Sequence, residues 1–310
     1  MRTSLAWLSL FLVPFVLHND VALAILVFTF ILGILAVSFN LIFGYTGQLS
    51  MFHAAAFGIA AYATDLSMSR LDVSFWVGAI IAIIVVIALS LVVGTICFRF
   101  RLREFYFAIV TLAFSEMTRL VILNWNSFTN GSLGINLTTT PTIWLPGGVV
   151  PVAGTRMWYY LSLVSLLSVV FVCTRVVQSW MGRCLAAIRL NDELAETLGI
   201  NVFLYKLISF LIGNAGAAIA GALYAFYLGY IEPAYLSIEQ SLAIVAMALL
   251  GGRETVAGPV IGAFILTALP HVISLSAELR VLLYGAILIC TILLLPRGIS
   301  GLIARPRYVS

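Results

Sequence analysis

Long apolar runs separated by short polar breaks fill almost the whole chain. Runs of about 17–25 apolar residues are typical of helices that cross the hydrocarbon core of a membrane. Two runs are shorter and favour tilted, partial or re-entrant segments, in which protein or a water-filled cavity covers the broken backbone. The pattern predicts about ten crossing or partly crossing helices, at residues 4–17, 21–43, 49–64, 73–97, 105–123, 157–178, 205–229, 238–250, 259–275 and 280–296, with 4–17 and 238–250 the short ones.

The overall composition points to the same class. The chain is 63% hydrophobic and only 9% charged, whereas the exterior of a soluble protein must be largely polar. We therefore expect an all-α, polytopic membrane protein in which residues 1–310 form a single transmembrane domain. The first run superficially resembles a signal peptide, but it lacks an Ala-x-Ala cleavage site and leads into another span. We expect it to be retained as a membrane helix.

Basic residues predict the orientation, because cytoplasmic loops of membrane proteins are enriched in Lys and Arg. With the N-terminus inside, ten crossings place both termini in the cytoplasm, and the net charge of +4 becomes a topological signal. The uncharged loop 124–155, rich in Thr, Gly and Pro, is expected to form an irregular extracytoplasmic cap. The charged residues expected outside are Asp20, Asp65, Arg70, Asp72, Arg156, Glu232, Glu278 and Arg280. The basic residues expected inside are Arg99, Arg101, Arg103, Arg175, Arg183, Arg189, Lys206, Arg253, Arg297, Arg305 and Arg307.

A cluster of charges interrupts the apolar pattern in and just after a predicted cytoplasmic loop, residues 183–204. Burying its six ionisable side chains in hydrocarbon would cost about 15–20 kcal/mol, at roughly 3 kcal/mol each. The cluster must therefore lie in water or against a partner. Its members are Arg183, Arg189, Asp192, Glu193, Glu196 and Lys206.

The same loop is predicted to contain a short helix with recognisable ends. Asn191 or Asp192 can cap its first turn through a side-chain oxygen. The carboxylates of Asp192 and Glu193 complement the positive end of the helix dipole. Gly199 provides a C-terminal stop, because glycine readily adopts the left-handed conformation that ends many helices.

One face of this predicted helix is apolar. Leu190, Leu194 and Leu198 recur at i, i+4 and i+8 and are expected to form a single stripe, with Glu196 on the opposite side. The stripe can lie flat on lipid or on the protein itself. It can also insert into a groove on a cytoplasmic partner. The spacing alone leaves both interpretations open.

No catalytic or metal site is apparent in the sequence. His18, His53 and His271 lie in different spans, and none has a metal-ligand neighbour at i+3 or i+4. No phosphate-binding GxxxxGK[ST] loop is present, and Lys206 is the only lysine. If ATP drives the protein, another subunit must bind the nucleotide. His53 follows a polar turn at residues 44–50, and we expect it to stabilise that turn.

Three further features fit either a structural or a transport role. Glu116 and Arg119 share a helix face. Glu116 is a candidate for a role in transport, because charged residues inside the membrane are often functional. Alternatively, it forms a structural ion pair with Arg119, whose side chain reaches outward. Small residues in 213–225 favour close helix packing and leave open a path between helices. Gly and Pro in 251–263 break a helix, either as part of a transport pathway or as a tight turn.

Three separated stretches resemble the membrane subunits of branched-chain amino acid ABC importers, of the LivM type. They are residues 44–50, 106–114 and 251–263, and the resemblance covers about residues 30–303. The segment 187–201 is similar to the coupling loop of that family. The resemblance implies an ABC importer permease fold with internal pseudo-symmetry, located in the bacterial inner membrane.

The resemblance also implies partners and roles. The partners are a second homologous permease subunit, two cytoplasmic ABC ATPase subunits, an extracytoplasmic substrate-binding protein and membrane lipid, with no nucleic acid. This chain would bind no cofactor, because ATP and Mg²⁺ would be held by the ATPase subunits. Coupling to the ATPases is assigned to Leu190, Asn191, Asp192, Glu193, Leu194, Ala195, Leu198 and Gly199. The candidate translocation path comprises Gln48, Ser50, Thr111, Glu116, Gly251 and Gly252.

The expected activity is therefore ATP-driven import of branched-chain or related neutral amino acids, with no enzymatic activity in this chain. Uptake of urea or short-chain amides is a related alternative, since permeases for urea resemble the same family. A stand-alone secondary carrier or channel is a different class. It would need its own ion-coupling charges, for which Glu116 is the only deep candidate.

Overall fold

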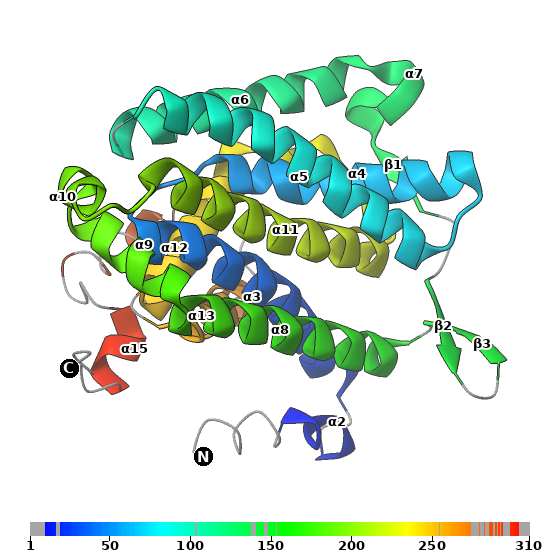
Figure 1. Cartoon of the computed structure of the whole chain (residues 1–310). Helices are drawn as coiled ribbons and strands as arrows, with labels where there is room; N and C mark the ends of the chain where they lie inside the picture. Colours follow the sequence, from blue (N-terminus) through cyan, green and yellow to red (C-terminus); the bar gives the residue numbers. More distant parts are fainter. Residues whose placement is uncertain are drawn as a thin grey trace.

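A bundle of long helices makes up the molecule. Nearly all the regular structure is helical, and the long helices run side by side (Figure 1). The predicted all-α, polytopic class is confirmed. The predicted span 280–296 and the start of the predicted span 4–17 fall largely outside the described part. The computed structural model describes residues 10–16, 19–102, 104–137, 141–145, 148–152, 154–253, 255–273 and 298–303, with scattered positions between 279 and 293.

The elements have the following bounds. The α-helices are α2 Val13–Val16, α3 Asp20–Thr46, α4 Phe52–Leu71, α5 Phe75–Arg99, α6 Glu104–Asn124, α7 Asn126–Thr129, α8 Thr155–Gln178, α9 Trp180–Leu190, α10 Asp192–Thr197, α11 Val202–Leu228, α12 Ile238–Gly251, α13 Gly258–Ile273 and α15 Gly298–Ile303. The 3-10 helices are η1 Gly131–Leu133 and η2 Pro233–Leu236. The strands are β1 Ile135–Asn136, β2 Thr142–Leu145, β3 Gly148–Pro151 and β4 Tyr230–Ile231.

Five of the described helices are long and apolar enough to cross a membrane: α3, α5, α6, α8 and α11. All five lie within a few residues of the predicted spans. The most apolar windows of α3 and α11 are 61% and 67% buried, against 28–33% for α5, α6 and α8. α3 and α11 are therefore central, and α5, α6 and α8 have apolar surface available to lipid. The protein is a multi-pass membrane protein.

α4 differs from these five because most of its residues are buried and it is not among the helices apolar enough to cross a membrane. The predicted span 49–64 was wrong at both ends, since the helix begins at Phe52 and continues to Leu71. Asp65, expected outside the membrane at the end of that span, lies within the helix and is buried. A helix surrounded by protein need not be as apolar as one that faces lipid, so hydropathy alone misplaced its ends.

The small residues on α11 allow close packing against α4. A Cβ atom added at Gly221 would lie only 1.9 Å from the carbonyl oxygen of Phe57, so no larger residue fits at this helix spacing. Ala217 and Ala225, four residues away on either side, are fully buried. This geometry favours the packing interpretation of the small-residue pattern.

Two similar units occur in opposite directions along the bundle. α3 and α11 each have 27 residues, and each is followed by a glycine in the left-handed conformation, Gly47 with φ 77° and Gly229 with φ 72°. The two helices are antiparallel, because Gly213 meets Ile42 and Gly216 meets Ser38. α3 is followed by a non-helical segment and then by α4, whereas α11 is followed by β4, the 3-10 helix η2 and then α12.

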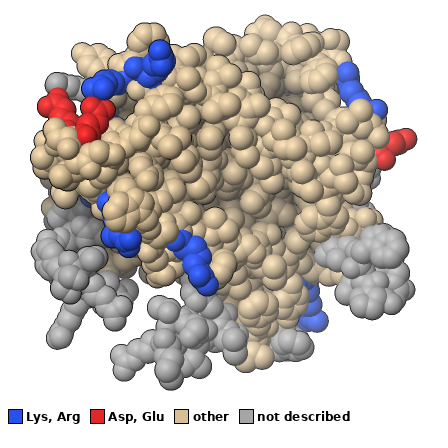
Figure 2. Space-filling model, in the orientation of Figure 1, with Lys and Arg blue, Asp and Glu red and all other residues tan. Residues whose placement is uncertain are grey.

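Charged residues gather at the two ends of the bundle. At the end called here the α10 end, Arg101 pairs with Glu196. At the opposite end, the α7 end, the guanidinium of Arg70 lies 4.3 Å from the ring centre of Phe128. Figure 2 shows this separation, with most of the blue and red side chains toward the left and right and a mainly tan band between. Such a band is the expected exterior of a protein that crosses a bilayer.

The loop 124–155 at the α7 end is more regular than the sequence predicts. It contains α7 and η1, and β2 pairs with β3 in an antiparallel hairpin that projects from the bundle (Figure 1). Before the hairpin in the chain, β1 pairs with β4, which connects the loop to the segment after α11. Nε1 of Trp76 also donates to the carbonyl oxygen of Thr142 at 2.7 Å. The expectation of an irregular cap was wrong, because short strand pairing escapes hydropathy.

Candidate functional site

The short helix α10 is a self-contained element at the α10 end. Oδ1 of Asn191 accepts from the backbone N–H of Leu194 at 3.0 Å and caps the first turn. At the other end Gly199 has φ 83°, and the N–H groups of Gly199 and Ile200 bond back to Glu196 and Ala195. This pair of bonds forms the Schellman motif that commonly ends a helix. Both ends therefore lie where the sequence predicts them.

The predicted three-leucine stripe needs a correction. Leu190 is the last residue of α9, and Asn191 is extended with φ −163° and ψ 115°, so the helix is interrupted between them. The i, i+4, i+8 spacing continues across this break, and the spacing alone does not reveal it. Leu190, Leu194 and Leu198 are nevertheless all exposed large apolar side chains, whereas Ala195 is buried.

The charges of this loop are partly paired inside the chain. Nζ of Lys206 in α11 forms an ion pair with Oδ2 of Asp192 in α10. Arg101, beyond the end of α5, pairs with Glu196 at 3.2 Å. Nη1 of Arg189 donates to the carbonyl oxygen of Gly44 at 2.6 Å, at the end of α3. The chain itself therefore supplies partners that the sequence argument sought in water or in another protein.

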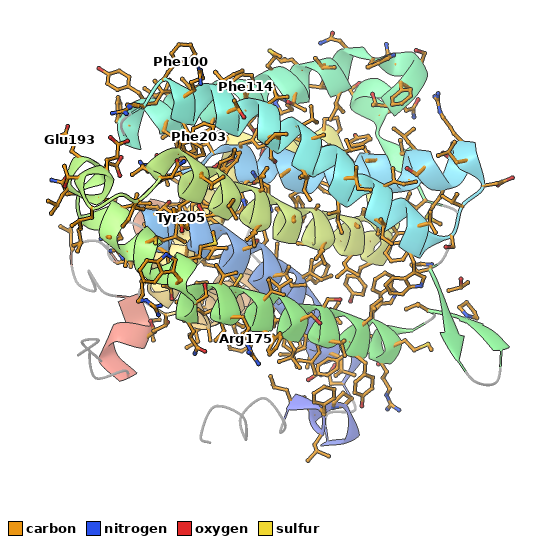
Figure 3. All side chains as sticks on the ribbon, in the orientation of Figure 1. Phe100, Phe114, Arg175, Glu193, Phe203 and Tyr205 are labelled. Atoms are coloured by element: carbon orange, nitrogen blue, oxygen red, sulfur yellow. The ribbon has the colours of Figure 1, made fainter. Side chains whose placement is uncertain are left out.

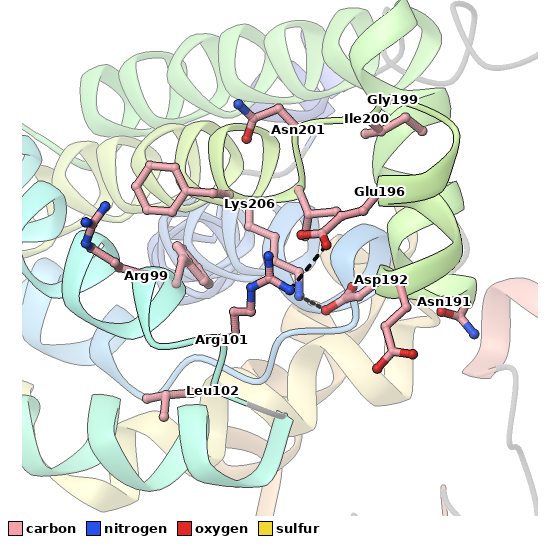
Figure 4. A pocket seen from close by; sticks show the side chains of 14 residues that line it. Arg99, Arg101, Leu102, Asn191, Asp192, Glu196, Gly199, Ile200, Asn201 and Lys206 are labelled. Atoms are coloured by element: carbon pink, nitrogen blue, oxygen red, sulfur yellow. Dashed lines mark hydrogen bonds and ion pairs between the residues drawn. The ribbon is translucent and has the colours of Figure 1, made fainter.

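A groove of about 800 Å³ lies between α10 and the adjoining ends of α5 and α11. Figure 4 shows Lys206, Asp192, Arg101 and Glu196 meeting across it. Figure 3 places Glu193 at the outer edge of this end of the molecule. Charged groups of both signs border the groove, together with Phe98 and other apolar side chains.

A second candidate region lies about halfway along the bundle, where α4 and α12 begin; we call residues 47–53 and 233–241 the central junction. The backbone N–H of Met51 donates to Oγ1 of Thr111 in α6 at 3.1 Å. Oγ of Ser241 in α12 donates to the carbonyl oxygen of Met51 at 3.3 Å. The starts of α4 and α12 therefore meet against α6. With 14 residues, α12 is about 21 Å long, too short for a hydrocarbon core of about 30 Å.

The contacts of His53 show how deep the central junction lies in the bundle. Its Nδ1 lies 3.0 Å from Oδ1 of Asn214 in α11, and Oγ of Ser38 in α3 lies 3.0 Å from its Nε2. Ser38 and Asn214 lie eight and twelve residues from the ends of their helices at the α10 end, roughly 12–18 Å at 1.5 Å per residue. The expectation that His53 only stabilises the polar turn was too narrow, because it joins three helices inside the bundle.

The junction also contains buried polar atoms that lack a partner among the described residues. They are Oε1 of Gln48 and Oγ of Ser50, and Nδ2 of Asn214 in the adjoining α11 lacks one as well. In the same part of the chain, no side chain caps the first turn of α4. Native proteins rarely leave such groups unpaired, and each exception calls for an explanation.

The other candidate path residues are separate from the junction. Glu116 forms a two-pronged ion pair with Arg119 on a partly exposed face of α6, and it lines a shallow pocket of about 550 Å³. Gly251 and Gly252 lie at the far end of α12, where a Cβ atom at Gly251 would lie 2.2 Å from the carbonyl oxygen of Gly258. The geometry there favours a tight turn between α12 and α13. The structure thus brings together Gln48, Ser50 and Thr111, but not the other three.

Sequence reasoning missed Asn214, Ser38 and the pairing of Lys206. Asn214 is a polar residue in an otherwise apolar helix, which is a usable signal, but its partner depends on how α11 packs on α4. Lys206 was expected in water or against a partner, although it is buried in the second turn of α11. Within the described residues, no group of three His, Cys, Asp or Glu side chains could hold a metal ion.

Comparison with known proteins gives one consistent result. A family model described as the branched-chain amino acid transport system permease component matches residues 21–292. The high-affinity branched-chain amino acid transport system permease protein LivM of Salmonella typhimurium is 28% identical over 293 residues, covering 87% of this chain and 68% of that protein. LivH of the same organism is 27% identical over 285 residues, covering 87% of this chain and 91% of that protein. The xylose transport system permease protein XylH of Escherichia coli is 38% identical over 115 residues, covering 36% of this chain and 28% of that protein. No solved structure matches the chain.

Proposed function

The chain belongs to the family of branched-chain amino acid transport system permease components, and from this membership we propose that it forms the membrane path of an ATP-driven importer for branched-chain or related neutral amino acids. The observation that carries the proposal is α10. It is a capped helix on which Leu194 is exposed, and Leu198, the residue that follows its last turn, is exposed as well. Exposed leucines on a short capped helix suit insertion into a groove on a partner.

The partner that fits α10 is a cytoplasmic ABC ATPase subunit. The sequence has no phosphate-binding loop of its own, so ATP and Mg²⁺ would be bound by two such subunits. In this proposal Leu190, at the end of α9, contributes to the same contact with Leu194 and Leu198. The α10 end is then cytoplasmic, which agrees with its arginines.

The translocation path in this proposal passes the central junction. Non-helical backbone and short helices at membrane depth are typical of transporter sites. Gln48, Ser50 and Thr111 would offer polar groups to a substrate there, and closure of the ATPases would reorient the helices around them. Glu116 is assigned to a structural ion pair outside the path.

Further partners follow from the relatives. Matches to both LivM and LivH support pairing with a second, homologous permease subunit. A binding protein would deliver substrate at the α7 end, outside a bacterial inner membrane. The partial match to a xylose permease indicates that this type of chain serves other small polar solutes, so the substrate itself belongs to the proposal.

The proposal is tested by placing a charge on α10. Leu194→Asp and Leu198→Asp should each abolish ATP-dependent leucine uptake in reconstituted vesicles and reduce co-purification of the ATPase subunits, with membrane insertion unchanged. Thr197→Asp is the matched control, because it adds the same charge to the same helix at an exposed polar position. Normal uptake in both leucine variants would remove α10 as the docking element. Uptake that needs no ATPase subunit would contradict the importer class.

A further inference from the structure

α10 has little to hold it in place except its side chains. It has six residues, and isolated helices of that length are unstable in water. Its backbone connections are non-helical on both sides: Asn191 is extended, and residues 198–201 form a turn with Gly199 in the left-handed conformation. Ala195 lies in a small buried apolar cluster with Ile188 of α9 and Val202 of α11. The orientation of α10 therefore depends on what its side chains contact.

Two ion pairs connect α10 to the bundle, and they differ in burial. The side chain of Lys206 is 6% exposed and that of Asp192 is 50% exposed. In the second pair, Arg101 is 76% exposed and Glu196 is 39% exposed. Water and salt screen exposed pairs strongly, so such pairs contribute little. A buried charge, by contrast, depends strongly on its partner. The Asp192–Lys206 pair is therefore the stronger of the two connections.

The buried pair leads directly to the central junction. Lys206 lies in the second turn of α11, and Asn214, which contacts His53, lies eight residues further along the same helix. This separation is about 12 Å at 1.5 Å per residue. α11 packs closely on α4 at Gly221 as well, so displacement of α11 must displace the start of α4.

We propose that the Asp192–Lys206 ion pair is the joint through which α10 moves α11, and that Asp192 and Lys206 are positioning residues for transport. This inference rests on the proposed function, in which an ATPase subunit pushes on α10. Leu194 and Leu198 receive the partner, whereas the ion pair passes the displacement to the membrane helices. Without the ion pair, the ATPase should still bind, but less substrate should be transported per ATP hydrolysed.

The test measures leucine transported per ATP hydrolysed, with the permease reconstituted with its second subunit, the ATPases and the binding protein. Asp192→Asn and Lys206→Met should each lower this ratio by about fivefold or more, the lower range for coupling between sites. The double variant should be no worse than the poorer single variant, because the second substitution removes no further interaction. Asp192→Glu keeps the charge and should retain most of the ratio.

The controls separate this role from general disruption. Glu196→Gln breaks the exposed pair on the same helix and should change the ratio less than about twofold. Lys206→Met also guards against misfolding, because it removes the buried charge that Asp192→Asn would leave unpaired. Three results would each overturn the inference. The ratio of leucine transported to ATP hydrolysed could be unchanged in both single variants, or the two losses could multiply in the double variant. Glu196→Gln could also lower the ratio as much as Asp192→Asn does. If the wild-type protein fails to bind the ATPases, the proposed function fails first and the inference falls with it.

Discussion

Replacing Ser50 by alanine should stabilise the protein and slow transport at the same time. Oγ of Ser50 is buried, and it has no hydrogen-bond partner among the described residues. A buried polar group without a partner costs about 1–3 kcal/mol, and alanine removes that cost with little change in volume. For a chain of this size such a gain corresponds to a rise in Tm of about 2–6 °C.

Ser90 provides a matched control for this prediction. Its Oγ is also buried and has no partner among the described residues, but it lies in α5, outside the central junction. Ser90→Ala should therefore raise the Tm by a similar amount and leave uptake unchanged. Only a hydroxyl that serves the substrate should combine gained stability with lost transport, a trade-off common at functional sites.

Both variants can be measured in the same preparations. Thermal unfolding in detergent gives the Tm, and ATP-dependent leucine uptake in reconstituted vesicles gives transport per permease. A Tm of Ser50→Ala below that of the wild-type protein would refute the reasoning, because it would mean that the hydroxyl is paired. Equal uptake in Ser50→Ala and Ser90→Ala would remove Ser50 from the path.

Two further predictions concern the packing of α11 and the charge on α6. Gly221→Ala places a methyl group 1.9 Å from the carbonyl oxygen of Phe57 and should cost about 1–3 kcal/mol, seen as a lower Tm, whereas Gly33→Ala meets nothing closer than 3.5 Å and should be nearly neutral. Equal Tm values would show that α4 and α11 separate freely. Glu116→Gln should lower the yield of folded protein, because Arg119 loses its ion pair, but uptake per folded molecule should be normal; a selective loss of uptake would return Glu116 to the path.

The sequence predicts the outer helices well for a physical reason. A helix that faces lipid must be apolar over the thickness of the hydrocarbon core, so α5, α6 and α8 appear directly as apolar runs. The capped ends of α10 are also readable, because Asn191 and Gly199 act on their own local backbone.

Features that depend on packing were not readable in the same way. The depth of His53 follows from its contacts with α3 and α11, which no spacing rule supplies. Leu190 was placed on the wrong helix because an i, i+4 pattern continues unchanged across a break. Lys206 was expected in water or against a partner because the sequence does not show that the fold buries it beside Asp192. The α7 end was misjudged because hydropathy carries no signal for two-residue strand pairing.

The low apolarity of α4 has a consequence for how the protein enters the membrane during synthesis. Phe52–Leu71 is not among the five helices apolar enough to cross on their own, and it carries Asp65. Charged residues are unfavourable for release of a nascent helix from the translocon into lipid. We therefore expect α4 to stay at the translocon until α5 has been synthesised. The two helices then enter the bilayer together as a helical hairpin. A nascent chain that stops before Phe75 would leave α4 outside the bilayer, so the order of synthesis, and not hydropathy alone, places this buried helix in the permease.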